Sequence, residues 1–192
     1  FFKNIEATAK AFQEYGIKKG DFATICAAGV PETVYSFYAL SKLGAVANMI
    51  APHFEKKDLI ARISDCESDI LIIMDEFYLE LKDAIKNSRI KNIIILPTLN
   101  SSILRFVSKK YKLDSHSNEL YWNQFIKDGK NREESQTVPY EKDLPLTMVY
   151  SSGTTGASKG ILLSNDSFQN SIQSYPASGV DISRGQKFYQ II

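Results

Sequence analysis

Hydrophobic and polar positions alternate between two spacings along the first half of the chain. Apolar residues such as Ile5, Ala9 and Phe12 recur at the spacing of one helical face. The next apolar run, Phe22–Ala27, is almost continuous, as expected of a strand that helices cover on both faces. The same alternation predicts helices over about 2–15, 29–43, 57–66 and 77–87, and strands over about 22–27, 45–50, 70–74 and 92–96.

Three of these helices have an apolar face that we expect to pack against a sheet. The inward residues are predicted to be Val34, Phe37, Tyr38 and Leu40 in the second helix, Leu59, Ile63 and Cys66 in the third, and Phe77, Leu81 and Ile85 in the fourth. Strands and helices that follow one another in this order are typical of an α/β fold. We therefore predict a doubly wound, mostly parallel sheet with right-handed connections and helices on both faces.

The second half of the chain has a weaker pattern. Residues 103–111 and 120–126 are predicted to be short helices, and residues 127–143, with four basic and five acidic side chains, to be a solvated connector. Apolar residues return at 146–150 and at 188–192, and we expect both stretches to be strands. These patterns divide the chain into βα units (1–97), a variable helical and polar connector (98–145) and a final segment (146–192).

Composition and charge fit a globular protein without a large charged surface. Of the 192 residues, 44% are hydrophobic, and 23 Lys and Arg balance 22 Asp and Glu to a net charge of +1. This balance gives no reason to expect a nucleic-acid or anionic-membrane partner. The longest aliphatic runs are far too short to span a bilayer, so no transmembrane segment is predicted. A polyanion would have to be held by a local group of residues.

Cys26 and Cys66 stand apart, without a CxxC spacing or neighbouring histidines. We interpret them as buried, reduced thiols of a cytoplasmic protein, with a single disulfide as the alternative. His53 and His116 are isolated and are predicted to be surface or loop residues rather than catalysts. Both ends of the chain lie inside apolar patterns, so we expect the sequence to be a piece of a longer protein.

A ten-residue loop, Ser151–Gly160, follows the strand at 146–150 and reads SSGTTGASKG. Its three glycines allow the backbone to turn and leave successive N–H groups free to point into one anion-binding concavity. Five hydroxyl groups add adaptable donors, and Lys159 adds a permanent positive charge. The alternative is a flexible hairpin loop, but hairpin loops usually have about two to five residues, and we expect this loop to join two buried strands. The composition therefore favours phosphate binding.

The loop lacks the Walker A spacing, and the chain has no GxGxxG sequence of a dinucleotide site. Residues 150–160, YSSGTTGASKG, instead resemble the phosphate-binding signature of the adenylate-forming superfamily, the AMP-dependent synthetases and ligases. That signature is [ST]-S-G-[ST]-T-G-x-P-K-G after an apolar or aromatic residue. The chain departs from it at Ser158, where proline is usual, and at Asn165, where many members have histidine. The matching residues are Ser151, Ser152, Gly153, Thr154, Thr155, Gly156, Lys159 and Gly160.

Segments upstream of the loop also resemble this family. The turn GIKKGD at 16–21, the helix end LSKLGAV at 40–46 and the helix at 58–69 have counterparts in it. The stretch Asn48-Met49-Ile50 is more similar to acyl-CoA synthetases than to the adenylation modules of peptide synthetases. The resemblance thus covers essentially the whole chain, and it implies a fragment of the large N-terminal domain of an adenylate-forming enzyme.

The resemblance implies an enzyme that uses ATP and Mg²⁺ to convert a carboxylic acid into an acyl-adenylate and pyrophosphate, then transfers the acyl group to a thiol, commonly that of coenzyme A. It assigns Lys159 to charge neutralisation. To the β- and γ-phosphates it assigns the hydroxyls of Ser151, Ser152, Thr154 and Thr155 and the backbone at Gly153 and Gly156. It places the magnesium ligands, the ribose contact, the acyl pocket and the adenylating lysine beyond Ile192. We therefore expect no catalytic residue or metal ligand in this chain, and no activity of the chain alone.

Two other classes of protein remain open at this point. One is a phosphate- or nucleotide-binding α/β module without ligase activity, and the other is a scaffold whose loop matches the signature by chance. Homo-oligomer formation also remains open, because nothing in the sequence bears on it.

Overall fold

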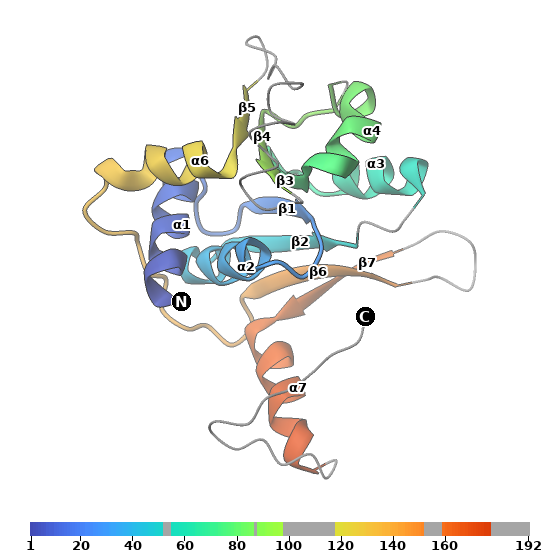
Figure 1. The fold of residues 1–192 in the computed structure, drawn as a ribbon. Helices are drawn as coiled ribbons and strands as arrows, with labels where there is room; N and C mark the ends of the chain where they lie inside the picture. The colour runs from blue at the N-terminus through green and yellow to red at the C-terminus, as the bar shows by residue number, and fades with distance from the viewer. Residues whose placement is uncertain (52–54, 87, 98–117, 152–158, 178–192) are drawn as a thin grey trace.

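A computed structural model describes residues 1–51, 55–86, 88–97, 118–151 and 159–177, with the elements labelled in Figure 1. The strands are β1 (Phe22–Cys26), β2 (Val46–Ile50), β3 (Ile70–Met74), β4 (Asn92–Leu96), β5 (Asn118–Tyr121), β6 (Pro145–Ser151) and β7 (Lys159–Ser164). The helices are α1 (Phe2–Glu14), α2 (Pro31–Leu43), α3 (Lys56–Asp65), α4 (Asp75–Lys86), α6 (Trp122–Asp128) and α7 (Asn165–Ala177), with a 3-10 turn at Gly129–Asn131. The elements predicted for residues 1–97 are confirmed, each to within two residues.

The described strands form one sheet of order β5-β4-β3-β1-β2-β6-β7. Neighbouring strands from β5 to β6 are parallel, and β7 runs antiparallel to β6. The parallel strands are short apolar runs, and β3 (ILIIM) is buried at every position. Such continuous burial requires cover on both sides of the sheet.

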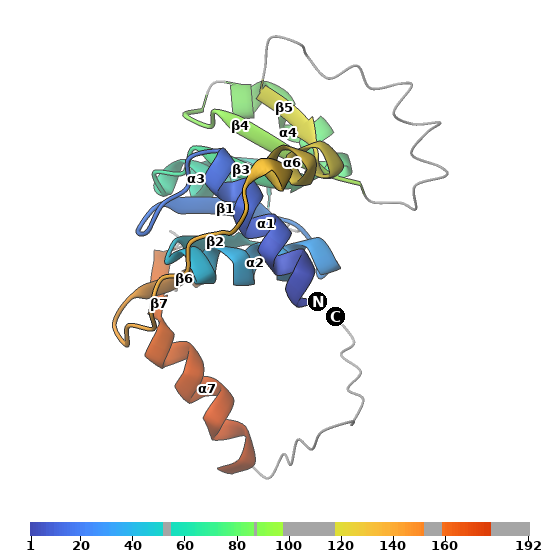
Figure 2. The ribbon, with the colours of Figure 1, turned by 90° about the vertical axis from the view of Figure 1, so that its left-hand side faces the viewer.

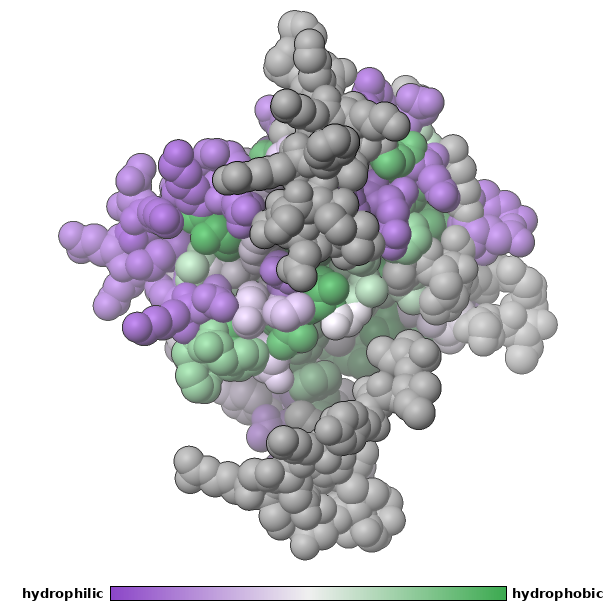
Figure 3. Space-filling model, viewed as in Figure 1, coloured by the Kyte–Doolittle hydropathy of each residue, from purple (hydrophilic) through white to green (hydrophobic). Residues whose placement is uncertain are grey.

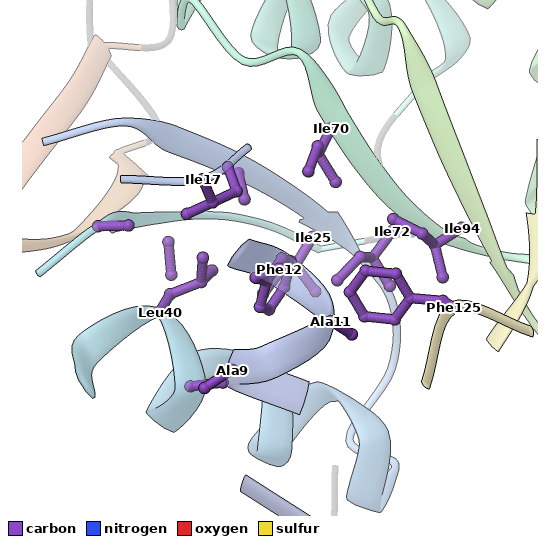
Figure 4. Packing of buried hydrophobic residues seen from close by; sticks show 14 of the residues in the cluster. Ala9, Ala11, Phe12, Ile17, Ile25, Leu40, Ile70, Ile72, Ile94 and Phe125 are labelled. Atoms are coloured by element: carbon purple, nitrogen blue, oxygen red, sulfur yellow. The ribbon is translucent and has the colours of Figure 1, made fainter. Parts of the chain in front are cut away.

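Helices pack on both faces of the sheet, which confirms the doubly wound fold (Figures 1 and 2). On one face, α1, α2 and α6 enclose a core in which the Phe12 and Phe125 rings lie 5.2 Å apart, close to Ile72 (Figure 4). On the other face, α3 and α4 cover a second core that includes Ile63 and Leu81. The last described helix, α7, extends away from the sheet beyond β7 (Figures 1 and 2).

The buried face of α2 includes Leu40 and, in part, Phe37, as predicted, but it differs from the prediction at two positions. Val34 and Tyr38 are 40% and 43% exposed, although the apolar pattern predicted that they point inward. Apolar surface accordingly gathers near the N-terminus and α2 (Figure 3). The fully buried positions include the small residues Ser36 and Ala39. The Ser36 hydroxyl donates to the Glu32 carbonyl over 2.8 Å, so its burial leaves the hydroxyl satisfied. Short side chains let the helix pack closely, which a ranking by hydrophobicity does not predict.

The inward face predicted for α4 is confirmed, and the structure adds one residue to it. Leu81 and Ile85 are buried, Phe77 is partly buried against the core, and Tyr78, which was not predicted to point inward, is fully buried. Phe77 and Tyr78 both share a helical face with Leu81, so spacing alone does not show which of the two is more deeply buried.

The prediction for residues 120–126 needs correction. They were predicted to be a helix, but they begin as the end of β5, and α6 starts only at Trp122. Hydrogen bonding of β5 to β4 decides this structure, and a four-residue strand leaves almost no periodic signal.

The buried residue Ser135 attaches the polar connector to α1. Ser135 is 8% exposed, and its backbone N–H and its hydroxyl each donate to the Glu6 carboxylate of α1 over 2.8 Å. The Lys42 ammonium group of α2 donates to the same carboxylate. Glu6 therefore joins the connector to two helices. The predictions for residues 103–111, 188–192, His53 and His116 concern positions outside the described residues.

Cys26 and Cys66 are both free and buried, as predicted. Burial raises the pKa of the Cys26 thiol to about 12, so this thiol stays protonated at neutral pH. Cys26 lies in the core covered by α3 and α4.

Candidate functional site

Three of the eight residues assigned to the loop are described, and they form the stem of a hairpin. Ser151 is the last residue of β6 and Lys159 is the first of β7, and the two are cross-strand partners. Gly160 pairs in the same way with Tyr150. The assigned residues outside the described part are Ser152, Gly153, Thr154, Thr155 and Gly156.

The connection between β6 and β7 is thus a hairpin, and the expectation that it joins two buried strands is wrong. Ile161 and Leu162 of β7 are 45% and 51% exposed. β7 is an edge strand of the described sheet, and its side chains gain little cover from β6 alone. The apolar run at 161–163 therefore predicted a strand correctly but not its burial.

The hairpin stem lies at the carboxyl edge of the parallel strands. β6 pairs with β2 through Asn48↔Met148, so Ser151 lies just past Ile50, the last residue of β2. Open α/β sheets bind their ligands outside this edge. The two ends of the glycine-rich segment therefore start from the part of the sheet where a ligand is expected.

The side chains of Ser151 and Lys159 lie on one face of the stem, and the side chain of Tyr150 lies on the opposite face. The Tyr150 hydroxyl donates to the Arg62 carbonyl of α3 over 3.0 Å, which places its ring on the α3 side. Successive side chains alternate across a strand, and cross-strand partners lie on the same side. Ser151 is half-buried and Lys159 is exposed. A hydroxyl and an ammonium group so placed can bind the same anion.

Gly160 permits close contact between β7 and β6. A Cβ atom at this position would lie 2.9 Å from the Met148 sulfur and 3.5 Å from Cε1 of Tyr150. Gly160 does not have a positive φ, and the atom in its way is the flexible end of the Met148 side chain. Glycine at this position therefore lets Met148 pack directly against the β7 backbone.

A buried polar cluster, which the sequence analysis did not predict, lies under the stem. Asn48 and Thr24 are fully buried in β2 and β1, and the Asn48 amide donates to the Thr24 hydroxyl over 3.1 Å and to the Cys66 sulfur over 2.9 Å. The Arg62 guanidinium lies 5.1 Å from the centroid of the Tyr150 ring. Burial, the largest cause, raises the pKa of Tyr150, so its hydroxyl remains a donor. We name these five residues the stem cluster.

Two signals in the sequence point to the stem cluster. Asn48 interrupts the apolar strand VANMI, and Arg62 lies three residues after Leu59 and four before Cys66, on the buried face of α3. Polar residues at core positions need partners, so each could have been singled out. The contact with Tyr150 links residues 88 positions apart, and no local pattern predicts it.

No metal or membrane site emerges from the described residues. Among them, no three His, Cys, Asp or Glu side chains are grouped so that they could hold a metal ion. Of the helices searched within the same residues, none is both long and apolar enough to cross a bilayer.

The described fold, with its hairpin at the carboxyl edge of a mostly parallel sheet, is similar to part of two solved enzyme structures. It superposes on an anthranilate CoA ligase in complex with anthranoyl-AMP with a TM-score of 0.72 and 21% identity, over 90% of this chain and 30% of the ligase. It also superposes on the acetoacetyl-CoA synthetase of Streptomyces lividans with a TM-score of 0.69 and 20% identity, over 91% of this chain and 26% of the synthetase.

Sequence comparison gives the family. Residues 1–189 match the family model described as AMP-binding enzyme, and the chain belongs to this family. It is 30% identical to the acetyl-coenzyme A synthetase of Pyrobaculum arsenaticum over 77% of the chain and 22% of the relative. It is 31% identical to that of Allorhizobium ampelinum over 84% of the chain and 25% of the relative. The chain therefore spans about a quarter of the length of these curated relatives.

Proposed function

We propose that this chain is part of the N-terminal domain of an enzyme that activates a carboxylic acid with ATP and passes the acyl group to coenzyme A. The observation that carries the proposal is the sequence SSGTTGASKG on a hairpin at the carboxyl edge of the sheet, in a member of the AMP-binding family. The relatives named above are acetyl-coenzyme A synthetases, which supports an acid–thiol ligase. Buried free thiols support a cytoplasmic location.

The chemistry has two steps, and the chain would serve the first. A carboxylate oxygen attacks the α-phosphorus of ATP, the bond from phosphorus to the bridging oxygen breaks, and pyrophosphate leaves. The thiol sulfur of coenzyme A then attacks the acyl carbonyl carbon, and AMP leaves. Charge grows on the departing pyrophosphate in the first step, so fixed donors and cations around it lower the barrier.

We assign the pyrophosphate end of ATP to the glycine-rich loop. The hydroxyls of Ser151, Ser152, Thr154 and Thr155, with the backbone at Gly153, Gly156 and Gly160, would bind the β- and γ-phosphates. Lys159 would neutralise their charge. The placement of Ser151 and Lys159 on one face of the stem supports this assignment, because both then reach a ligand from the same side.

We propose that the remaining groups come from parts of the enzyme outside this chain. The ribose contact, the acyl pocket and the magnesium ligands are not assigned to any residue here, and Mg²⁺ bound elsewhere would supply further charge neutralisation. In the part of the chain that the structure describes, no three His, Cys, Asp or Glu side chains are grouped as metal ligands. The chain's own contribution is the positioning of the phosphates.

Carboxylate-dependent exchange between pyrophosphate and ATP tests the proposed function. The full-length protein would be assayed with acetate, longer aliphatic acids and aromatic acids, and each reaction would be repeated without acid. We expect exchange that requires one class of acid, followed by release of AMP when coenzyme A is added. Binding of ATP without acid-dependent exchange would instead indicate a nucleotide-binding module without ligase activity.

A further inference from the structure

We propose that Tyr150 is a positioning residue for the phosphate-binding loop, which fastens the end of β6 to α3 and thereby fixes Ser151 and Lys159. The inference rests on the proposed function and adds to it a residue that would touch neither ATP nor the acid. Three features carry it: the acceptor that Tyr150 binds, the support under that acceptor, and the position of Tyr150 in the hairpin.

The acceptor is a carbonyl at the end of a helix. α3 ends at Asp65 with Cys66 as its C-cap, so the Arg62 carbonyl lies in the last turn of the helix. Arg62 is only 5% exposed, so a hydrogen bond to its carbonyl forms where little water competes for it. The Tyr150 hydroxyl donates to this carbonyl over 3.0 Å, and the Asn48 amide approaches it at 3.4 Å. The contact therefore connects the end of β6 to the last turn of α3.

The support under Tyr150 is buried within the sheet. Asn48 and Thr24 are fully buried on adjacent strands, and the Cys66 sulfur lies 3.3 Å from the Thr24 hydroxyl. The Arg62 guanidinium covers the Tyr150 ring. Fully buried groups with several partners have few alternative positions. The partner of Tyr150 is thus fixed by two central strands of the sheet.

The position of Tyr150 connects this support to both ends of the loop. Ser151 follows Tyr150 directly, and Gly160 and Lys159 stand opposite the two residues on β7. The described part of β7 is bound to the sheet through β6 alone. Fastening of β6 at Tyr150 therefore also restrains β7. Without the hydrogen bond from Tyr150, the Ser151 hydroxyl and the Lys159 ammonium group would still be present, but the distance between them would no longer be fixed. Misplaced groups bind a transition state less well.

The test compares two matched variants of the full-length enzyme, Tyr150→Phe and Tyr15→Phe. Each removes one phenolic hydroxyl that donates a hydrogen bond, and Tyr15 donates to Asp128 over 2.6 Å on the opposite face of the sheet. The measurements are the KM for ATP, the KM for the acid, the melting temperature and the rate of amide hydrogen exchange in residues 150–160. If Tyr150 had only a structural role, both substitutions would change the melting temperature, and neither would change the KM for ATP.

We expect Tyr150→Phe to raise the KM for ATP about two- to tenfold, the range of one neutral hydrogen bond, and to leave the KM for the acid unchanged. Amide exchange in the stem should accelerate in Tyr150→Phe and not in Tyr15→Phe. An active wild type with an unchanged KM for ATP in Tyr150→Phe would overturn this inference alone. A wild type without acid-dependent exchange would overturn the proposed function, and the positioning role with it.

Discussion

Ser151 and Lys159 stand directly opposite one another in the β6–β7 ladder, at the two ends of the segment 152–158. Cross-strand partners in an antiparallel ladder have Cβ atoms about 4.5–5.5 Å apart. The first hydroxyl and the cation of the signature are therefore neighbours, although seven residues separate them in the sequence. A pyrophosphate group bound between the ends of the loop would contact both.

Replacement of Lys159 by alanine should slow the ATP-dependent reaction. A charge-assisted hydrogen bond contributes about 1.5–3 kcal/mol, which corresponds to a loss of roughly 10- to 150-fold in kcat/KM for ATP. The preference among acids should not change, because the acyl contacts lie elsewhere. Pyrophosphate exchange kinetics of the full-length enzyme measure both quantities.

Lys142→Ala is the matched control for this variant. Lys142 is exposed and lies near the other end of the same hairpin, where it pairs with Asp166 over 3.6 Å. Its loss changes the net charge equally but removes no group from the stem. If Lys159→Ala changed kcat/KM by less than about twofold, or no more than Lys142→Ala, Lys159 would not be a phosphate ligand.

Glu6 should stabilise the fold above about pH 4.5 and lose this effect in acid. Burial alone would raise the pKa of this carboxyl, but the hydrogen bonds from Lys42 and Ser135 outweigh it and lower the pKa from 4.5 to about 2. A lowered folded-state pKa means that the contribution is complete above the unfolded-state value and disappears as the pH falls from about 4.5 towards 2. Because Glu6 is partly exposed, we expect about 1–2 kcal/mol.

Urea unfolding of the wild type and Glu6→Gln at several pH values checks this prediction. The stability difference should be largest near neutral pH and should shrink below about pH 4. Glu134→Gln, an exposed position on the same connector, serves as the control. A difference for Glu6→Gln that did not depend on pH would show that the carboxylate charge is not what holds the connector.

Gly129→Ala should strongly destabilise the contact between α6 and α1. A Cβ at Gly129 would lie 2.5 Å from the Ala11 nitrogen and 2.7 Å from its Cα, and backbone atoms cannot turn away as a side chain can. The φ of Gly129 is −74°, so alanine adopts it without strain and the whole cost is steric. We expect a loss of about 1–3 kcal/mol in the free energy of unfolding.

Gly29→Ala is the corresponding control, because a Cβ there meets nothing within 4 Å and φ is not positive. Thermal and urea unfolding of both variants should show a large change for Gly129→Ala and almost none for Gly29→Ala. Equal effects would mean that α6 does not pack on α1 at this distance.

Residues 1–192 produced alone should release no pyrophosphate above background. They supply the phosphate contacts of the proposal, but the acid and the ribose have no assigned site in them, and misplacement of reacting atoms by about 1 Å already costs roughly a hundredfold. The assay is acid-dependent pyrophosphate release, with a loop-deleted chain as the baseline. Turnover above that baseline would place the acid site within this chain.

The sequence predicted the parallel strands well because they are its strongest signal. β3 and β4 were placed at their observed bounds, since a continuous apolar run between polar turns has few alternative structures. β5 was missed because four residues are too few for a periodic pattern, and its structure depends on pairing with β4. The inward face of α2 was right at Leu40 and Phe37 but wrong at Val34 and Tyr38, because packing depends on shape as well as hydrophobicity, and Ala39 fits where Tyr38 does not.

The residues of the candidate site could be proposed from the sequence, but the contacts that support them could not. The signature assigned Ser151, Lys159 and Gly160 to the loop from residue types alone, and the structure adds that the first two are partners in a ladder. The hydrogen bond from Tyr150 to Arg62 joins residues that only the fold brings together. Local patterns contain no information about such a contact.

Chemical labelling of Lys159 in the full-length protein tests the central claim most directly. A lysine acylating reagent would be applied with and without ATP, pyrophosphate or adenosine, and the labelling of Lys159 and Lys142 would be quantified by peptide mass spectrometry. If Lys159 binds the phosphates, ATP and pyrophosphate should protect it, adenosine should not, and Lys142 should be labelled equally throughout. Labelling of Lys159 that saturating ATP leaves unchanged would contradict phosphate binding by this hairpin.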